Sequence, residues 1–154
     1  MEKKMEMEKN IFRNIIFGKH LKFEGEYLNG KKNGKGKEYF PQYGKHLKFE
    51  GEYLNGKKNG EGKEYNEEGN LKFEGEYLNG KRWNGKGFDG NNKIVYELKN
   101  GNGIIKEYEY NSLYRGYEDR GYIIVFEGLY LKGEKNGMGK EYYKNGRLKF
   151  EGDI

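Results

Sequence analysis

The sequence lacks cysteine and alanine, contains a single proline and has no long apolar run. Without cysteine, the chain has no disulfide framework and no thiolate metal site. The apolar stretch near the N-terminus, residues 11–17, is interrupted by Arg13 and Asn14, so it is too short and too polar for a signal-peptide core or a membrane span. We therefore predict a soluble, cytoplasmic protein that is not exported, with peripheral attachment at a membrane as the alternative.

Hydrophobic residues are also scarce, at 33% of the chain against 36% charged residues. Such a composition normally indicates disorder. However, the chain contains 15 Tyr, 9 Phe and 26 Gly, and its glycines recur at fixed spacing. We therefore predict a folded chain with a thin core of aromatic rings packed on glycine backbone.

Short internal repeats occupy most of the chain, which matters because a missed repeat misassigns the whole fold. Residues 18–39 and 44–65 differ only at Lys35 and Glu61. Further copies begin at Leu71 and Ile123, and a partial copy begins at Leu148. We predict an N-terminal helical cap or flexible segment at 1–17 and a repeat array at 18–154, with repeats at about 21–46, 47–70, 71–94, 95–122 (diverged), 123–147 and 148–154 (partial).

Each repeat has the pattern of a β-hairpin. In residues 21–27 an apolar residue or glycine alternates with a charged one, which is typical of a half-buried strand. Asn29-Gly30 is a strong hairpin-turn signal. Gly34 and Gly36 in the second strand leave room for rings to lie on the backbone. The predicted fold is all-β, an elongated single-sheet solenoid of antiparallel hairpins with a ring ladder of Phe23, Phe49, Phe73, Phe126, Tyr27, Tyr53, Tyr77 and Tyr130.

The two ends of the array need separate treatment, because the ends of a repeat array must be covered. Ile11, Phe12, Ile15 and Ile16 fall on one helical face, so we predict a short N-terminal helix that caps the first repeat. The partial repeat at 148–154 leaves a strand edge that favours a homodimer through the C-terminal repeat.

The repeated pattern resembles the MORN repeat. It stands here as FEGEYLNGKKNGKG (23–36), FEGEYLNGKKNGEG (49–62) and FEGLYLKGEKNGMG (126–139), while the copy at 73–87 carries one inserted residue near Trp83. The resemblance implies β-hairpin arrays that act as scaffolds and protein-binding modules, many of them antiparallel dimers, with lipid binding suggested for some. The LK-x-EG opening and KEY ending also resemble a bacterial variant found in proteins described as antitoxins.

Catalytic chemistry is not supported by the residue inventory. His20 and His46 occupy the same position of duplicated repeats without nearby Cys or Asp, and Ser112 is the only serine. Glu24 and Glu26 recur in the repeats beside lysines, which indicates a solvated cross-strand charge ladder instead of a catalytic carboxylate pair. We predict no enzyme activity, no catalytic residues, no metal site and no cofactor. Because residues 47–70 carry six acidic side chains against four basic ones, a continuous basic stripe for nucleic acid is not expected.

Three features are candidates for binding. The rings could contact a protein partner or serve only as core, and Trp83 could lie at an interface or be buried by its turn insertion. The predicted partner-binding set is Phe23, Tyr27, Phe49, Tyr53, Phe73, Tyr77, Trp83, Phe126 and Tyr130. The lysine-rich turns could contact anionic headgroups or form a solvated margin that resists edge aggregation. The predicted anionic-surface set is Lys31, Lys32, Lys57, Lys58, Lys81 and Arg82.

These patterns favour a non-catalytic scaffold or protein–protein interaction module whose partner the sequence does not identify. Two alternatives remain open, namely a peripheral adaptor on anionic, phosphoinositide-like membranes and an antitoxin- or immunity-type partner of a toxin. Salt dependence separates the membrane alternative from the others, because contacts through lysine turns weaken as salt rises.

Overall fold

The strands described here come from a computed structural model, which describes residues 9–17, 20–43, 46–113 and 121–154. The regular structure in these ranges is β-strand apart from a turn of 3-10 helix at Pro41–Tyr43. The strands are β1 (Lys9–Phe17), β2 (His20–Leu28), β3 (Lys31–Tyr39), β4 (Leu47–Leu54), β5 (Lys57–Tyr65), β6 (Leu71–Leu78), β7 (Lys81–Phe88), β8 (Ile94–Leu98), β9 (Gly103–Tyr110), β10 (Tyr122–Leu131), β11 (Glu134–Tyr142) and β12 (Leu148–Asp153). The predicted all-β class with antiparallel hairpins is confirmed.

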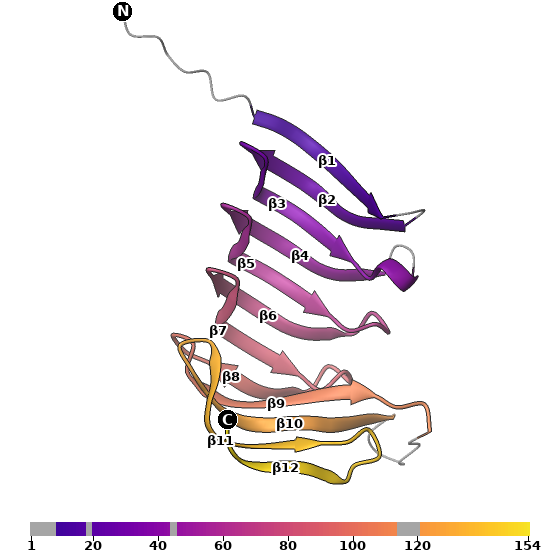
Figure 1. Ribbon diagram of the computed structural model, residues 1–154, viewed down its shortest axis with the longest axis vertical. Helices are drawn as coiled ribbons and strands as arrows, with labels where there is room; N and C mark the ends of the chain where they lie inside the picture. Colours follow the sequence, from indigo (N-terminus) through magenta and orange to yellow (C-terminus); the bar gives the residue numbers. More distant parts are fainter. Residues whose placement is uncertain (1–8, 18–19, 44–45, 114–120) are drawn as a thin grey trace, which may run out of the picture.

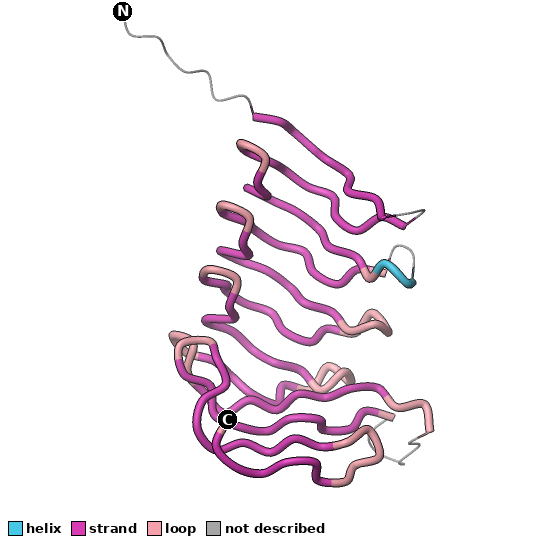
Figure 2. The backbone as a smooth tube through the Cα atoms, in the orientation of Figure 1, coloured by secondary structure: helices cyan, strands magenta, loops and turns pink. Residues whose placement is uncertain are grey.

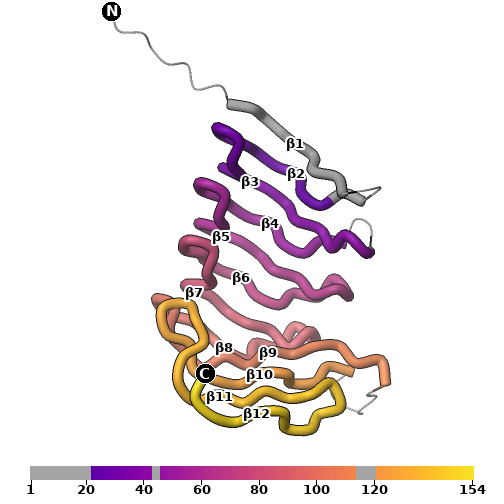
Figure 3. The backbone as a smooth tube through the Cα atoms, viewed as in Figure 1, coloured from indigo at the N-terminus to yellow at the C-terminus, as the bar shows by residue number. Residues whose placement is uncertain are grey.

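The strands form two sheets. Strands β1 to β8 pair in chain order, and β9 to β12 form a second, four-stranded sheet (Figure 1). Figure 3 follows this order by colour from β2 to β12. The prediction of a single sheet is therefore wrong.

The break between the sheets lies in the diverged repeat. In the regular hairpins glycines face each other across the strands, as Gly25 faces Gly36. In β8 and β9 the corresponding positions hold Leu98 and Ile105, whose side chains are fully buried. These bulky side chains fill the space in which rings elsewhere lie on glycine, and the pairing between β8 and β9 is limited to a bridge from Lys99 to Asn102.

The predicted N-terminal helix is also wrong. Residues 9–17 form β1, which pairs antiparallel with β2 from Lys9 opposite Leu28 to Phe17 opposite His20. Without β1, the edge of β2 would present a row of unpaired backbone groups, and pairing satisfies them. The register shifts between Asn10 and Arg13, so the strand accommodates an irregularity there. The remainder of the predicted helix, residues 1–8, lies outside the described residues.

The ring ladder is the core, as predicted. Phe23, Phe49, Phe73 and Phe126 are 0–2% exposed, and Tyr27, Tyr53 and Tyr77 are 4–7% exposed, with Tyr130 partly buried against them. Phe23 meets Tyr27 of its own strand and Tyr53 of the next repeat edge-on, both at 5.5 Å between ring centroids. Such pairs contribute about 0.5–1.5 kcal/mol each beyond the burial of their area.

In the first hairpin, the aromatic ring of Phe23 lies against the backbone of Gly25 and Gly36. A Cβ at Gly36 would lie 2.6 Å from Phe23 Cζ, and one at Gly25 would lie 2.6 Å from the Gly36 Cα. No side chain fits either position, so ring packing on glycine is confirmed for these two residues. The same expectation is wrong for Gly34, which adopts a φ of 94° beside the Glu26 side chain instead of lying under a ring.

The hairpin turns stack along one side of the molecule, which we call the turn edge (Figure 2). The predicted turn at Asn29-Gly30 is confirmed, and both residues adopt positive φ. In the next repeat, Gly56 N–H donates to the Lys32 carbonyl at 2.8 Å and Asn55 N–H donates to the Asn33 side-chain oxygen at 3.4 Å. The same two bonds recur from Asn79 and Gly80 to Asn59 and Lys58, from Asn100 and Gly101 to Asn84 and Trp83, and from Lys132 and Gly133 to Asn102 and Gly101.

Candidate interaction surface

Cationic side chains cover the rings on the ring face, the side of the sheets that carries the Phe and Tyr core. Lys32 lies 4.2 Å from the Phe23 ring centroid, and Lys58 lies 4.1 Å from that of Phe49. Lys32 also pairs with Glu38 at 3.0 Å, and Tyr53 donates its hydroxyl proton to Glu38 at 2.8 Å. The ring face is therefore closed by a layer of charges and hydroxyl groups.

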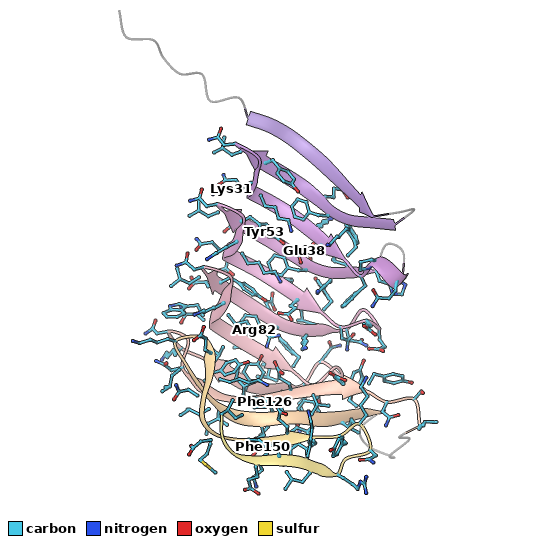
Figure 4. The ribbon with its side chains drawn as sticks, in the orientation of Figure 1. Lys31, Glu38, Tyr53, Arg82, Phe126 and Phe150 are labelled. Atoms are coloured by element: carbon cyan, nitrogen blue, oxygen red, sulfur yellow. The ribbon has the colours of Figure 1, made fainter. Side chains whose placement is uncertain are left out.

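Arg82 replaces lysine in this layer in the third repeat and joins the two sheets. Its guanidinium binds the Glu64 carboxylate through two hydrogen bonds of 2.8 and 3.1 Å and donates to the Tyr96 hydroxyl at 2.8 Å. It also reaches Glu107 in β9 at 3.4 Å. Figure 4 shows Arg82 in this position beside the strands of both sheets. Sequence reasoning missed this cluster, although the change from Lys-Lys to Lys-Arg at 81–82 was a visible signal.

The electrostatics of Glu64 follow from this arrangement. Burial acts to raise the pKa of its carboxyl, but the attraction and hydrogen bonding of Arg82 outweigh burial and hold the pKa at about 2. In the same way, burial and the neighbouring Glu38 carboxylate raise the pKa of the Tyr53 hydroxyl far above its usual range. Both groups therefore keep one protonation state throughout the physiological range.

The predicted binding residues divide between core and surface. The eight predicted rings, Phe23, Tyr27, Phe49, Tyr53, Phe73, Tyr77, Phe126 and Tyr130, lie in or against the core described above. Trp83 is partly exposed. Of the predicted cations, Lys31 and Lys57 are exposed at the turn edge, Lys81 pairs with Glu134 at 2.6 Å, and Lys32, Lys58 and Arg82 lie over the rings. Their roles in binding stay predictions.

The opposite side of the sheets carries the expected charge ladder, and we call it the ladder face. Glu24 lies opposite Lys37, and Lys37 lies opposite Glu50 of the next hairpin. The alternation continues through Lys63, Glu74, Lys86 and Glu97 in the first sheet and through Lys106, Glu127, Lys140 and Glu151 in the second. Ion pairs along it measure 3.1 Å for Lys63–Glu74 and 3.2 Å for Lys140–Glu151. The predicted cross-strand ladder is confirmed.

Shallow grooves run along the ladder face over the glycine pairs. One of about 570 Å³ lies between the two charged rows, over the backbone of Gly25, Gly36, Gly51 and Gly62. A second of about 440 Å³ extends to Trp83 and is lined by Glu52, Glu61 and Glu76. A third of about 380 Å³ lies in the second sheet.

The second groove is acidic because of a single difference between repeats. Lys35 lies opposite Glu52, whereas Glu61, its counterpart in the next repeat, lies directly opposite Glu76. Like charges in this position are destabilising. The exchange of Lys35 for Glu61 was visible in the sequence, but its cross-strand neighbour was not.

Of the two histidines that the sequence singles out, the structure describes the side chain of His46. His46 Nδ1 lies 3.2 Å from the Glu67 backbone oxygen, and the side chain of His20 lies outside the described residues. In the described ranges no group of three or more His, Asp or Glu side chains is placed to hold a metal ion. Those ranges also contain no helix long and apolar enough to cross a membrane.

The repeats match a known family. The family model of the MORN repeat matches residues 23–45, 49–70 and 126–146. No curated protein matches the sequence. The matched segments cover β2–β3, β4–β5 and β10–β11, the three hairpins in which a Phe ring lies on glycine and a lysine caps the ring. The chain is a MORN-repeat protein.

Proposed function

We propose that the chain is a non-catalytic scaffold that binds protein partners through its ladder face. In this proposal the hairpins act as a solenoid-like frame, and the grooves between the charged rows receive side chains of the partner. The supporting observation is the contrast between the two faces. The rings of one face are buried under a charged cover, whereas the other face carries open grooves over glycine backbone.

The ladder face suits the recognition of proteins for two physical reasons. Its charges alternate in sign, so it can select a partner by complementarity without attracting every anion or cation. The groove between the rows has the backbone of Gly25, Gly36, Gly51 and Gly62 as its floor, and a partner's side chain can enter it. Trp83 adds an aromatic side chain, of a type enriched among residues that dominate binding energy.

Binding to an anionic membrane is the second candidate, and fewer observations support it. It rests on Lys31 and Lys57, which are exposed at the turn edge. Lys32, Lys58 and Arg82 are held over the rings, and Lys81 pairs with Glu134. Since a basic residue contributes about 1 kcal/mol near an anionic surface, the two lysines of the predicted set that are exposed give a weak attachment.

Site-specific crosslinking tests the proposal directly, because the chain has no native cysteine. Three single-cysteine variants carry the same photo-crosslinker, namely Lys37→Cys on the ladder face, Lys57→Cys on the turn edge and Glu68→Cys on the opposite, loop edge. Each is irradiated in an extract of the native host, with and without an excess of unlabelled chain. We expect a discrete adduct from Lys37→Cys that the excess abolishes.

The other outcomes count against the proposal. Adducts from the turn or loop edge alone would move the contact away from the ladder face. No competed adduct at any position would remove the case for a protein-binding scaffold. Flotation with anionic vesicles at low and physiological salt, comparing the unmodified chain with a Lys31→Gln/Lys57→Gln variant, measures the membrane alternative separately.

A further inference from the structure

Two nearly identical repeats differ at a single position, and that position lies on the ladder face. Residues 18–39 and 44–65 share every residue except Lys35, whose counterpart is Glu61. Lys35 lies opposite a glutamate, so opposite charges face each other across the strands. Glu61 instead lies opposite Glu76, an arrangement that costs stability. A residue that weakens the fold in one copy alone indicates a role other than folding.

The exchange makes one groove acidic. Glu61 and Glu76 line the groove of about 440 Å³, and Glu52 lines it beside them. All three side chains are exposed. No lysine or arginine is among the described residues that line this groove. The chain as a whole has a net charge of +5, so the groove is an acidic site on a basic molecule.

Trp83 gives the same groove an aromatic wall. Its side chain is partly exposed and lies against the backbone of Gly101, where a Cβ would meet Trp83 Cζ3 at 2.8 Å. Its backbone carbonyl accepts a hydrogen bond from the Gly101 N–H at 2.7 Å. The neighbouring turn therefore holds the indole ring in place at the end of the groove.

Carboxylates beside an aromatic ring suit a planar organic cation. In the described ranges no group of three or more acidic side chains is placed to hold a metal ion. A guanidinium, by contrast, can stack on a ring and bind two carboxylates through its fork of N–H groups. The chain uses this chemistry itself on the ring face, where Arg82 lies 5.1 Å from the Phe73 ring centroid and forms two hydrogen bonds to Glu64.

We propose that the acidic groove binds an arginine side chain of the protein partner, with the guanidinium against Trp83 and beside Glu61 and Glu76. Charge complementarity identifies the occupant as a cation, and the aromatic wall favours a guanidinium over the more strongly hydrated ammonium group. The proposal rests on the proposed scaffold function and names the chemistry of its partner, which presents a basic segment to β5, β6 and β7.

An NMR titration of the nitrogen-15-labelled full chain with pentaarginine amide tests the proposal. The indole N–H of Trp83 and the backbone N–H of Glu61 report on the groove itself. Both signals should shift and saturate at millimolar or lower concentrations of the probe, as a weak single-site contact does. Pentacitrulline amide, which keeps the shape of the side chain but carries no charge, should cause no saturating shift.

Glu61→Lys is the informative variant, because the first repeat already holds lysine at this position. It should weaken the binding of pentaarginine by about tenfold or more, since it replaces an attraction by a repulsion. It should also raise the thermal midpoint by up to about 4 °C, because it removes the like-charge pair. A glutamate that served the fold alone would give the opposite change in the midpoint.

Glu68→Lys at the loop edge is the matched control, because it makes the same change of charge away from the groove. Charges that far apart are screened by salt, so binding should stay within about twofold of the original. Equal weakening by Glu68→Lys and Glu61→Lys would overturn the proposal, because it would reveal a general attraction. A lowered midpoint in Glu61→Lys would overturn it in favour of a structural role.

Absence of a saturating shift at about 10 mM pentaarginine would also overturn the proposal. A pentalysine amide that binds as tightly as pentaarginine would overturn the assignment of a guanidinium. These outcomes leave the scaffold proposal standing, since the crosslinking experiment detects a partner of any chemistry. Conversely, loss of every crosslinked adduct would count against the scaffold without changing the result of the titration.

Discussion

Substitution of Arg82 tests whether one side chain holds the two sheets together. Arg82→Lys introduces the residue found at the equivalent positions 32 and 58. A lysine can keep one bond to Glu64 but loses the second, together with the bond to Tyr96 and the contact with Glu107. Hydrogen bonds that involve a charged group contribute about 1.5–3 kcal/mol each. Because the lysine keeps its charge beside Glu64 and offsets part of the lost bonds, we expect a loss of about 2–4 kcal/mol in the free energy of unfolding.

Arg82→Met should destabilise the fold more than Arg82→Lys, because it leaves the Glu64 carboxylate buried without a cation. Breaking a buried pair in this way costs about 3–5 kcal/mol. It should also change the response to acid. The folded pKa of Glu64 is about 2, below its ordinary value of 4.5, so the stabilisation is complete above about pH 4.5 and is lost as the pH falls toward 2. This amounts to about 3 kcal/mol, and Arg82→Met should abolish it.

Urea unfolding, monitored through the fluorescence of Trp83, the only tryptophan, measures both the loss of stability and its dependence on pH. The free energy of unfolding is compared at pH 7 and pH 3 for the unmodified chain and both variants. The reasoning would be refuted if Arg82→Lys lost less than about 1 kcal/mol, the size of an ordinary surface effect. It would equally be refuted if Arg82→Met kept the acid sensitivity of the unmodified chain.

Three further substitutions test the packing of single repeats. Gly62→Ala places a methyl group 2.6 Å from Phe49 Cζ and should lower the thermal midpoint through a loss of about 1–3 kcal/mol; an unchanged midpoint would contradict ring packing on glycine. Tyr53→Phe removes the 2.8 Å bond to Glu38 and should lose about 1–2 kcal/mol in urea unfolding, and no loss would show that the hydroxyl is dispensable. Asn59→Ala removes the acceptor of the Asn79 N–H and should speed its hydrogen exchange about tenfold, while equal rates would exclude the turn-to-turn bond.

The repeat hairpin could be predicted because its determinants are local. Alternation over seven residues specifies which rings share a face, and Asn-Gly specifies the turn. The face on which Lys32 and Lys58 lie could not be predicted in this way. A register shift between Gly25 and Tyr27 places Lys32 opposite Tyr27, on the ring face. Beyond such an irregularity, alternation along the strand no longer tells which face a residue lies on.

The two wrong fold predictions arose from the pairing of strands, which neither a helical periodicity nor the repeat pattern reveals. Residues 11–16 fit a helical face, but the strand edge of β2 is satisfied only by pairing with them. The break between the sheets depends on Leu98 and Ile105, two aliphatic residues in a segment whose repeat pattern is too diverged to assign glycine positions.

The turn edge differs mechanically from the opposite edge. Its two hydrogen bonds per repeat continue through the break, from Trp83 and Asn84 to the turn at Asn100-Gly101 and on to Gly133. The connections at the opposite edge vary in length, so the first three repeats, at Leu21, Leu47 and Leu71, begin 26 and 24 residues apart. The repeats are thus held together at the turn edge, whereas the loop edge sets no fixed distance between them. Residues inserted in the loops would separate the repeats at the loop edge without breaking the hydrogen bonds of the turn edge. Chains of this type can therefore change the curvature of the sheet, and the shape offered to a partner, by lengthening one edge alone.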